Sequence, residues 1–331
     1  MVILLTGGTG YIASHTAVAC IERGHEVILF DNLSNSNSNV VNSLEQILHQ
    51  KITFIQGDVL NTDFLREVLT KYHVDSVIHF AGLKSVKDGA ELPIPYYDNN
   101  VAGTISLLKA MNSAHVKQLV FSSSATVYGY PEYLPYDEKH PTQPINVYGR
   151  TKLQVENILQ DLSISDPDWK ILSLRYFNPV GAHESGLIGE RPNGIPNNLM
   201  PFVAKVANGE LPVLNVYGND YDTKDGTGER DYIHVMDLAD GHVAALNYLA
   251  QSKAFQCINL GTGIPYSVYE LVNAFEKACG KKIPMKISPR RLGDLPFYYA
   301  DPSLAKQLLR WKAKRSLIDM CETTWKFQKT K

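Results

Sequence analysis

Residues 2–13 read VILLTGGTGYIA, and this stretch decides the fold. An apolar run of strand length passes directly into a glycine turn, and a helical pattern begins at Tyr11. Gly7, Gly10 and Ala13 form a GxxGxx(G/A) variant of the dinucleotide-binding fingerprint, in which the turn and the helix N-terminus hold a pyrophosphate. The stretch therefore predicts the first βα unit of a nucleotide-binding sheet.

Short apolar runs continue to alternate with longer helical patterns up to about residue 180, which is typical of a parallel sheet. Strands are predicted at 2–6, 26–31, 52–58, 76–81, 118–123 and 170–176, and helices at about 11–23, 41–49, 62–72, 96–114 and 147–163. The fold class predicted is α/β, with a doubly wound Rossmann domain over residues 1–178 that binds the dinucleotide and also carries the catalytic residues.

The composition shifts to Gly, Pro and Asn beyond Asn178, so a smaller mixed α/β region is predicted over 179–331. It should contain short elements at 213–217 and 257–260, helices at about 235–250 and 267–279, and terminal helices after Pro302. This region is expected to bind mainly the substrate, with some segments returning to the Rossmann domain.

The bulk composition excludes several classes of function. A net charge of -2 and a pI near 6.6 argue against bulk binding to nucleic acid or to a membrane surface. The four cysteines form no CxxC, and the opening apolar run is too short for a signal or spanning segment, so the cytoplasm is expected. No metal is predicted, because the acidic residues at 220–229 miss calcium-loop spacing and the histidines show no paired ligand spacing.

Asp31 ends the second predicted strand about 20 residues after the glycine turn. A carboxylate there can accept the ribose 2'-hydroxyl and repel a 2'-phosphate, which favours NAD over NADP. The alternative is an ordinary turn or cap residue, since Asn32 opens a Ser/Asn-rich loop. Asp58, Ala81 and Gly82 should lie on the same carboxyl edge of the sheet.

The candidate catalytic motif is YGRTK at 148–152, in which Tyr148 and Lys152 are neighbours at i and i+4 on a predicted helix. A nearby cation favours the phenolate form of a tyrosine, so the pair suits proton transfer. The alternative is a lysine stem lying over an amphipathic ring on a solvated face. With the glycine turn, Asp31 and Ser124, the pair has the order and spacing of the short-chain dehydrogenase/reductases in their extended form.

Longer stretches resemble one family within that group, the UDP-glucose 4-epimerases, also called UDP-galactose 4-epimerases. They are TGGTGYIASH at 6–15, HFAGLKSV at 79–86, YYDNNVAGT at 96–104, FSSSATVYG at 121–129, LRYFNPVGAH at 174–183, GIPNNLMP at 194–201, GTGERDYIHVMDLADGH at 226–242 and PRRLGDLP at 289–296. The related sugar-nucleotide 4,6-dehydratases have an Asp-Glu pair where this chain has Ala125 and Thr126.

The resemblance implies reversible interconversion of UDP-galactose and UDP-glucose in galactose metabolism. The sugar is oxidised at C4 with tightly bound NAD, the 4-keto intermediate rotates, and hydride returns to its other face. The implied catalytic residues are Tyr148, Lys152 and Ser124. The cofactor would contact Gly7, Gly10, Tyr11, Ile12, Asp31, Asn32, Asn35, Ser36, Asp58, Val59, Phe80, Ala81, Gly82, Lys84, Asn99, Ser122, Tyr148, Lys152, Tyr176 and Phe177.

The UDP-sugar would contact Ser124, Asn178, Asn198, Leu199, Tyr217, Arg230, Tyr232, Arg291, Asp294 and Tyr298. The alternative for the arginines is a surface ion pair with Asp231 or Asp294. In the family, a bulky residue at the position of Tyr298 goes with plain hexoses, so poor activity on N-acetylated sugars is expected; a core-filling tyrosine is the rival explanation.

Two places depart from the family pattern: Ala13 replaces the usual third glycine, and residues 87–89 read Lys-Asp-Gly where Gly-Glu-Ser is usual. Alternatives remain: an epimerase acting on UDP-glucuronate or a UDP-N-acetylhexosamine, or a nucleotide-sensing homologue without activity. The resemblance also implies a homodimer that pairs the helices at about 96–114 and 147–163.

Overall fold

The computed structural model describes residues 1–192, 194, 196–251, 255–291 and 293–330, and its centre is a seven-stranded sheet. The order across the sheet is β10-β6-β5-β4-β1-β2-β3, and every neighbouring pair is parallel. The strands are β1 (Val2–Thr6), β2 (Glu26–Asp31), β3 (Thr53–Gln56), β4 (Ser76–His79), β5 (Gln118–Ser124), β6 (Lys170–Tyr176) and β10 (Gln256–Leu260). The strand order reverses between β1 and β4, which makes a switch point where α/β sheets bind ligands.

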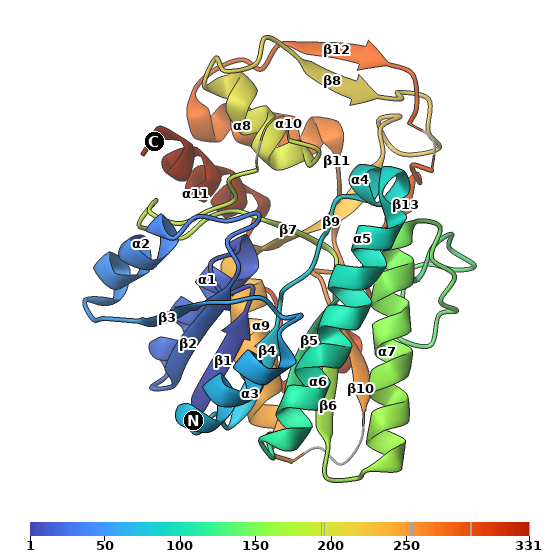
Figure 1. The fold of residues 1–331 in the computed structure, drawn as a ribbon. Helices are drawn as coiled ribbons and strands as arrows, with labels where there is room; N and C mark the ends of the chain where they lie inside the picture. The colour runs from blue at the N-terminus through green and yellow to red at the C-terminus, as the bar shows by residue number, and fades with distance from the viewer. Residues whose placement is uncertain (193, 195, 252–254, 292, 331) are drawn as a thin grey trace.

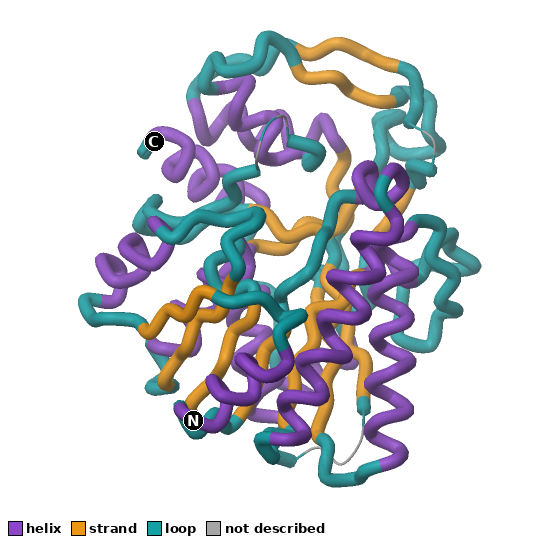
Figure 2. The backbone as a smooth tube through the Cα atoms, in the orientation of Figure 1, coloured by secondary structure: helices purple, strands orange, loops and turns teal. Residues whose placement is uncertain are grey.

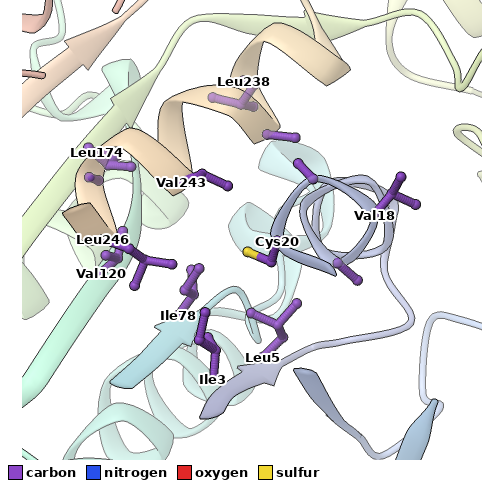
Figure 3. Packing of buried hydrophobic residues seen from close by; sticks show 14 of the residues in the cluster. Ile3, Leu5, Val18, Cys20, Ile78, Val120, Leu174, Leu238, Val243 and Leu246 are labelled. Atoms are coloured by element: carbon purple, nitrogen blue, oxygen red, sulfur yellow. The ribbon is translucent and has the colours of Figure 1, made fainter. Parts of the chain in front are cut away.

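Helices cover both faces of this sheet, because alternate strand residues point to opposite sides and both sets are apolar. Ile3 and Leu5 pack with α1 (Tyr11–Ile21) and α9 (Val235–Leu249), and α2 (Asn39–Leu48) adds Leu44 to the same core (Figure 3). Leu4 points the other way, into a core with α3 (Thr62–Lys71), α6 (Gly103–Ser113) and α7 (Val147–Ser165). Figure 2 shows α6 and α7 running in front of the strands. The predicted doubly wound sheet is confirmed.

The helix predicted at 96–114 begins earlier and is not uniform. Helix α4 (Val86–Glu91) and helix α5 (Pro93–Tyr97) precede a π-helical turn, η1 (Asp98–Ala102), which runs directly into α6. The π turn widens the helix at Asn100, which is buried. Such local widenings often occur at functional sites, and this one faces the carboxyl end of β4.

A second layer of elements lies above the carboxyl ends of the sheet strands (Figure 1). Three strands pair with a common partner, β9 (Glu229–His234): these are β7 (Asn178–Val180), β11 (Pro265–Ser267) and β13 (Phe297–Tyr298). A separate pair joins β8 (Leu214–Tyr217) to β12 (Met285–Ser288). Helices α8 (Leu199–Ala207), α10 (Val268–Cys279) and α11 (Leu317–Lys329) enclose a core of their own.

Two segments from this later part of the chain return to the first. Strand β10 is the seventh sheet strand, paired with β6, and α9 packs against α1. A π-helical turn, η3 (Ala305–Leu309), and a 3-10 turn, η2 (Ala125–Val127), complete the elements. The division of the chain at residue 178 stays a prediction. No helix in the described ranges is both long and apolar enough to cross a bilayer.

Candidate active site

The glycine turn after β1 packs closely against the loop that follows β4. Gly7 has a φ of +67°, and a Cβ built on it would lie 2.8 Å from the Ala81 nitrogen, so conformation and space both require glycine. Gly10 caps α1 without a side-chain hydrogen bond. The first-turn N–H groups of α1 are therefore left to hold an anion, and the buried Ala13 fits within the helix beneath them.

Asp31 lies at the end of β2 and organises the neighbouring loops. Its carboxylate accepts hydrogen bonds from the Thr9 N–H (3.1 Å), the Leu33 N–H (2.8 Å) and the Ser36 hydroxyl (3.1 Å). An ionised carboxylate has about four acceptor sites, so capacity remains for a ribose hydroxyl. These contacts show that the turn-residue role and the predicted ribose role are compatible at this position.

Asn32 and Asp58 bring the ends of β2 and β3 together. The Asn32 side-chain amide donates to the Asp58 carboxylate at 2.9 Å, and Asp58 also accepts the Leu60 N–H at 2.9 Å. Val59, by contrast, buries its side chain in the core against Gly103, so only its backbone is left for a cofactor. Polar groups from three strand ends thus converge beside the glycine turn, as an adenosine-binding edge requires.

Ser124, Tyr148 and Lys152 meet at the carboxyl end of β5. Ser124 is the last residue of β5, and the other two lie one turn apart in α7. A Cβ on Gly149 would lie 2.7 Å from the Thr126 carbonyl oxygen, so this glycine lets α7 approach the strand end closely. The Asn146 side chain caps the helix by accepting the Gly149 N–H at 2.8 Å.

The Lys152 ammonium is buried and held by the strand beneath it. It donates to the Ser122 carbonyl oxygen at 2.7 Å and lies 4.8 Å from the Phe121 ring centroid. The Tyr148 ring centroid is 5.8 Å away, so the cation is near the phenol ring, as the i, i+4 spacing predicts.

The acidity of Tyr148 differs from the expectation. Burial raises the pKa of Tyr148 to about 12, although a hydrogen bond with Ser124 lowers it in part. Burial also lowers the pKa of Lys152 to about 8, while the charge of Glu156 raises it. In the chain alone the Lys152 ammonium therefore does not offset the effect of burial on the pKa of Tyr148. Burial disfavours both the phenolate of Tyr148 and the ammonium of Lys152. A further positive charge is needed to make Tyr148 a base near neutral pH.

Asn100 is a site residue that the sequence reasoning missed. Its side-chain oxygen accepts the Leu83 N–H at 2.7 Å, and its nitrogen donates to the Leu83 carbonyl and the Thr151 hydroxyl, both at 3.0 Å. It fixes the loop after β4 against α7, beside Lys152. The neighbouring Asn99, the predicted contact, is half-buried on the same π turn. The local sequence does not show which of the two adjacent asparagines is buried. The π turn decides this, because it places the Asn100 side chain inside.

Glu190 is a second residue that no motif identified. Its carboxylate pairs with the Lys84 ammonium at 3.0 Å and accepts a hydrogen bond from the Asn198 amide at 3.3 Å. Glu190 thus bridges the predicted cofactor residue Lys84 to the predicted substrate residue Asn198. Nearby, the Tyr11 hydroxyl donates to the Gly181 carbonyl at 2.6 Å, which joins α1 to the loop after β7.

The two arginines of the predicted UDP-sugar set lie together on the upper layer. Arg291 pairs with the Asp294 carboxylate at 2.9 Å and stacks over the Tyr217 ring at 4.8 Å. Arg230 lies 3.8 Å from the same carboxylate and donates to the Leu295 carbonyl at 2.7 Å. The ion pair with Asp294 considered from the sequence is therefore present, and it holds both guanidinium groups at one place.

Tyr298 pairs by register with Arg230 and closes the lower side of this group. Its ring packs against Tyr136 (5.0 Å between centroids) and Phe177 (5.5 Å), and its hydroxyl is buried without a hydrogen-bond partner among the described residues. Burial raises the pKa of Tyr298 well above its ordinary value, so its hydroxyl stays protonated and the side chain presents an uncharged aromatic surface.

The remaining predicted residues take up positions around these groups. Asn178 of β7 pairs by register with the buried Tyr232 of β9, and Leu199 begins α8. Tyr176 is the last residue of β6, and its hydroxyl shares a hydrogen bond with the His242 ring. The Phe80 ring packs against the same histidine. Ile12 packs against the core below α1, and Ser36 bonds the Thr9 hydroxyl at 2.7 Å. Asn35 lies beside Ser36 in the loop between β2 and α2.

The turn after Ser124 contains no acid. Ala125 is buried, and the Thr126 hydroxyl donates to the Ser124 oxygen at 3.0 Å. A carboxylic acid is the group that expulsion of water from a sugar requires at this turn in the dehydratases. The chain therefore presents a hydroxyl, a phenol and an ammonium here, a set suited to moving one proton.

Four buried histidines make hydrogen bonds within the fold. His79 bonds Thr6 (2.6 Å) and Thr104 (2.9 Å), while His15 and His242 bond backbone carbonyls one turn away in their own helices. His234 caps α9 by accepting the Met236 N–H at 3.1 Å. Within the described residues, His, Cys, Asp and Glu side chains form no group of three that could hold a metal.

Comparison with known proteins gives consistent matches over the whole chain. The family model described as GDP-mannose 4,6 dehydratase matches residues 4–324. A UDP-glucose 4-epimerase of Bacillus subtilis (strain 168) is 52% identical over 328 residues, which are 99% of this chain and 97% of that protein.

Two solved structures also match this chain over its whole length. The UDP-glucose 4-epimerase of Stenotrophomonas maltophila, with bound NAD and formylated UDP-arabinopyranose, has a TM-score of 0.98 at 48% identity and covers 100% and 98% of the two chains. That of Bifidobacterium longum, with NAD+ and UDP, has a TM-score of 0.95 at 50% identity, again covering 100% and 98%.

Proposed function

The chain belongs to the UDP-glucose 4-epimerase family, and from this premise we propose that it interconverts UDP-galactose and UDP-glucose, a step of galactose metabolism. It is an NAD-dependent isomerase. The observation that carries the proposal is the convergence of Ser124, Tyr148 and Lys152 beside a turn that has no acid. The broad dehydratase family model therefore describes the fold, while this turn favours inversion of a hydroxyl without loss of water.

The residues around the glycine turn fit NAD. The Gly7 turn leaves no room for a Cβ, the first turn of α1 has no side-chain cap, and Asp31 places a negative charge where a 2'-phosphate would lie. When bound, NAD supplies the hydride acceptor and then the hydride donor for C4 of the sugar, together with a positive nicotinamide. That charge would favour the phenolate of Tyr148, whose pKa burial raises in the chain alone.

Tyr148 would remove the proton from the sugar 4-hydroxyl and return it after the sugar has turned. Ser124 lies beside the phenol, whose pKa it lowers, at the strand end from which its hydroxyl would also reach the 4-oxygen. The Lys152 ammonium, anchored on the Ser122 carbonyl, stabilises the phenolate while it exists. The 4-keto sugar rotates between the two transfers, so both faces of C4 are presented to the cofactor.

Rotation requires that the protein hold the nucleotide more firmly than the hexose. Arg230 and Arg291 provide charge-assisted donors for a diphosphate, and Asp294 both fixes them and offers an acceptor to the uridine ribose. The hexose would face Tyr298 and Phe177, whose aromatic surfaces restrict volume without gripping hydroxyl groups. Glu190 holds Lys84 and Asn198 together, and so would link the part of the site that binds the cofactor to the part that binds the sugar nucleotide.

The proposal is tested by incubating the purified protein with UDP-galactose and measuring UDP-glucose. Tyr148→Phe should lower kcat by about 10²- to 10⁴-fold, because the proton loses its acceptor. The exposed Tyr130→Phe is the matched control and should leave kcat unchanged. Absorbance and fluorescence of the protein as purified should show bound NAD(H) in both variants.

The alternatives are outcomes of the same experiment. Faster turnover of UDP-glucuronate or UDP-N-acetylglucosamine would reassign the substrate within the family. Binding of UDP-sugars without any interconversion would support a nucleotide-sensing homologue. Unchanged kcat in Tyr148→Phe would reject the proton-transfer role.

The homodimer and the location are also proposals. Ile105 of α6 and Ile164 of α7 are 36% and 71% exposed, and such apolar side chains support a paired interface involving these two helices. Sedimentation equilibrium should show a dimer at micromolar concentration, and a single monomeric species would reject it. The four free thiols support the cytoplasm, where cysteines stay reduced.

A further inference from the structure

A buried ion pair lies behind the catalytic residues, and the chemistry described so far does not use it. Glu156 and Arg175 are 3% and 5% exposed. The Glu156 carboxylate accepts two hydrogen bonds from the Arg175 guanidinium, at 2.7 and 3.0 Å. It also accepts one from the Ser123 hydroxyl at 2.6 Å and one from the Ser173 hydroxyl at 2.9 Å. All of these partners lie within the protein.

Glu156 continues the catalytic face of α7. Tyr148, Lys152 and Glu156 follow one another at intervals of four residues, so they lie on successive turns of one helix face. Each contacts one of three consecutive serines at the end of β5. The Tyr148 phenol lies near enough to Ser124 for that hydroxyl to lower its pKa, the Lys152 ammonium donates to the Ser122 carbonyl, and the Glu156 carboxylate accepts from the Ser123 hydroxyl.

Arg175 extends the connection to the far edge of the sheet. Its guanidinium donates to the Tyr128 hydroxyl at 3.0 Å, which donates to the Asn259 side chain at 2.7 Å. Asn259 in turn donates to the Tyr136 carbonyl at 3.0 Å. The pair therefore ties α7 to β5, β6 and β10, and reaches Tyr136, whose ring supports Tyr298.

The charges of the pair are hard to explain by stability alone. Removing two charges from water is costly, and well-packed apolar residues in place of a buried ion pair are often neutral or more stable. A hydrophobic pair could fill this space between α7 and the sheet. The carboxylate, however, lies one helical turn from Lys152, where its charge acts on the ammonium.

We infer that the Glu156–Arg175 pair positions α7 on the end of β5 and sets the electrostatic potential at Lys152. Both are positioning residues, since neither reaches the ligand site. The inference rests on the proposed function and deepens it, because it names what keeps the catalytic ammonium charged. The groups that face Lys152 are Tyr148 and Glu156 from α7, His79 from β4, the Ser122 carbonyl and Phe121 ring from β5, and the Asn100 amide from η1.

The sign of the effect follows from the charges. Burial lowers the pKa of Lys152 to about 8, and the Glu156 carboxylate opposes this by raising it. Loss of the carboxylate should therefore lower the pKa of Lys152 further, and the unpaired Arg175 should add to that effect. Loss of the Arg175 charge should do the opposite, because Glu156 would then act on Lys152 without its counterion.

The test compares the pH profiles of kcat for NAD-loaded Glu156→Gln, Arg175→Gln and the double variant. The alkaline limb of each profile reports the loss of the Lys152 proton. We expect this limb to move to lower pH in Glu156→Gln and to higher pH in Arg175→Gln, with kcat lowered at least 10-fold in each variant. Asp161→Asn, which removes an exposed carboxylate from the same helix, should leave the limb in place. A merely structural role would lower kcat equally at every pH and move neither limb.

The double variant keeps the test decisive if a single variant does not fold, because it leaves no unpaired buried charge. It should fold, bind NAD and still show a reduced kcat with the limb at lower pH. A double variant that matches the unmodified protein in kcat and limb would overturn the inference.

A titration of tyrosinate absorbance needs no turnover and separates this inference from the proposed function. The difference between each protein and its Tyr148→Phe counterpart reports the Tyr148 pKa. The titration is made on the NAD-loaded proteins, because the positive nicotinamide would favour formation of the phenolate while Lys152 is still charged. Under that condition Glu156→Gln should raise the Tyr148 pKa, since a less charged Lys152 stabilises the phenolate less. An unchanged titration in both single variants would contradict the inference whether or not the chain is an epimerase.

Discussion

At the scale of single residues, the site combines groups whose ordinary acidities are shifted in opposite directions by burial. The pKa of Tyr148 is raised to about 12 and that of Lys152 lowered to about 8. The YxxxK spacing predicts that the two side chains meet, and they do. It does not predict desolvation, which depends on Phe121, Tyr96 and the other groups that cover them.

Tyr298 gives a prediction about substrate size at this scale. Its ring fills space between Tyr136 and Phe177, and its hydroxyl gains no hydrogen bond among the described residues. Tyr298→Ser should therefore open the hexose side and raise kcat/KM for UDP-N-acetylglucosamine about 10-fold or more relative to UDP-glucose. Tyr133→Ser, an exposed tyrosine, serves as control.

If the ring only fills the core, the Tyr298→Ser protein would lose thermal stability while its preference between the two sugars stayed the same. The ratio of the two kcat/KM values, measured beside the melting temperature, separates these explanations. A ratio equal to that of the unmodified protein would reject the selective role.

At the scale of elements, the start of α7 decides where Tyr148 lies. Asn146 caps the helix through the Gly149 N–H, and Gly149 allows the helix to approach the Thr126 carbonyl. Asn146 precedes the predicted motif and Gly149 is one of its unspecified positions, so neither residue was used to find it. A local cap and a close backbone approach thus convert a sequence spacing into a catalytic geometry.

Loss of this cap should loosen the catalytic turn. Asn146→Ala should lower the free energy of unfolding by about 1 kcal/mol, the usual effect of removing an N-cap. Because Tyr148 lies in the first turn, kcat should fall while KM for UDP-galactose changes little. Asn146→Ser, which restores a capping oxygen, should recover most of both; urea denaturation and steady-state kinetics measure them.

The corresponding cap of α3 is the control. Asn61 accepts the Phe64 N–H at 3.1 Å, far from the catalytic turn in sequence, so Asn61→Ala should cost similar stability with unchanged kcat. Equal losses of kcat in Asn61→Ala and Asn146→Ala would mean that the cap acts only through overall stability.

At the scale of the whole molecule, two layers of elements are joined by chain crossings. Strand β10 and helix α9 come from the later part of the sequence and complete the sheet of the first part. The upper layer covers the carboxyl ends of the strands (Figure 1), the edge at which α/β sheets bind ligands. Stability and site geometry therefore depend on the same packing.

Buried histidines give a pH-dependent stability at this scale. Burial lowers the pKa of His15, His79 and His234 to about 3 and that of His242 to about 4, from an ordinary value of 6.5. These rings stay neutral in the fold but accept a proton when unfolded. Each should cost about 1.4 kcal/mol of unfolding free energy per pH unit as the pH falls below 6.5.

Urea denaturation between pH 7 and 5 measures this slope, a window above the range in which carboxylates titrate. Stability should fall steadily as the pH is lowered from 6.5 to 5 and should be level above pH 7. His49→Asn, at an exposed left-handed helix end that tolerates asparagine, should leave the slope unchanged. A level profile down to pH 5 would show that these histidines do not remain neutral in the fold.

Most of the first sheet could be predicted from the sequence because its strands are buried on both faces and separated by amphipathic helices. Its strand ends differ from prediction by one or two residues, as at 52–58 against Thr53–Gln56. The strands β7, β11 and β13 have three residues or fewer, too short for any periodic pattern. Their existence depends on β9, with which all three pair.

The sequence by itself determined the glycine turn, the acid at Asp31 and the Ser124, Tyr148 and Lys152 set, because each lies within one strand, turn or helix whose local geometry follows from spacing. Only the tertiary structure decided that Asn100 fixes the loop beside Lys152, that Glu190 bridges Lys84 to Asn198, and that Glu156 and Arg175 share a buried pair. Apart from Glu190 with Asn198, which are 8 residues apart, these contacts join distant residues: the separation is 17 for Asn100 with Leu83, 19 for Glu156 with Arg175 and 106 for Lys84 with Glu190. Their energies come from burial and packing between elements, which no local pattern records.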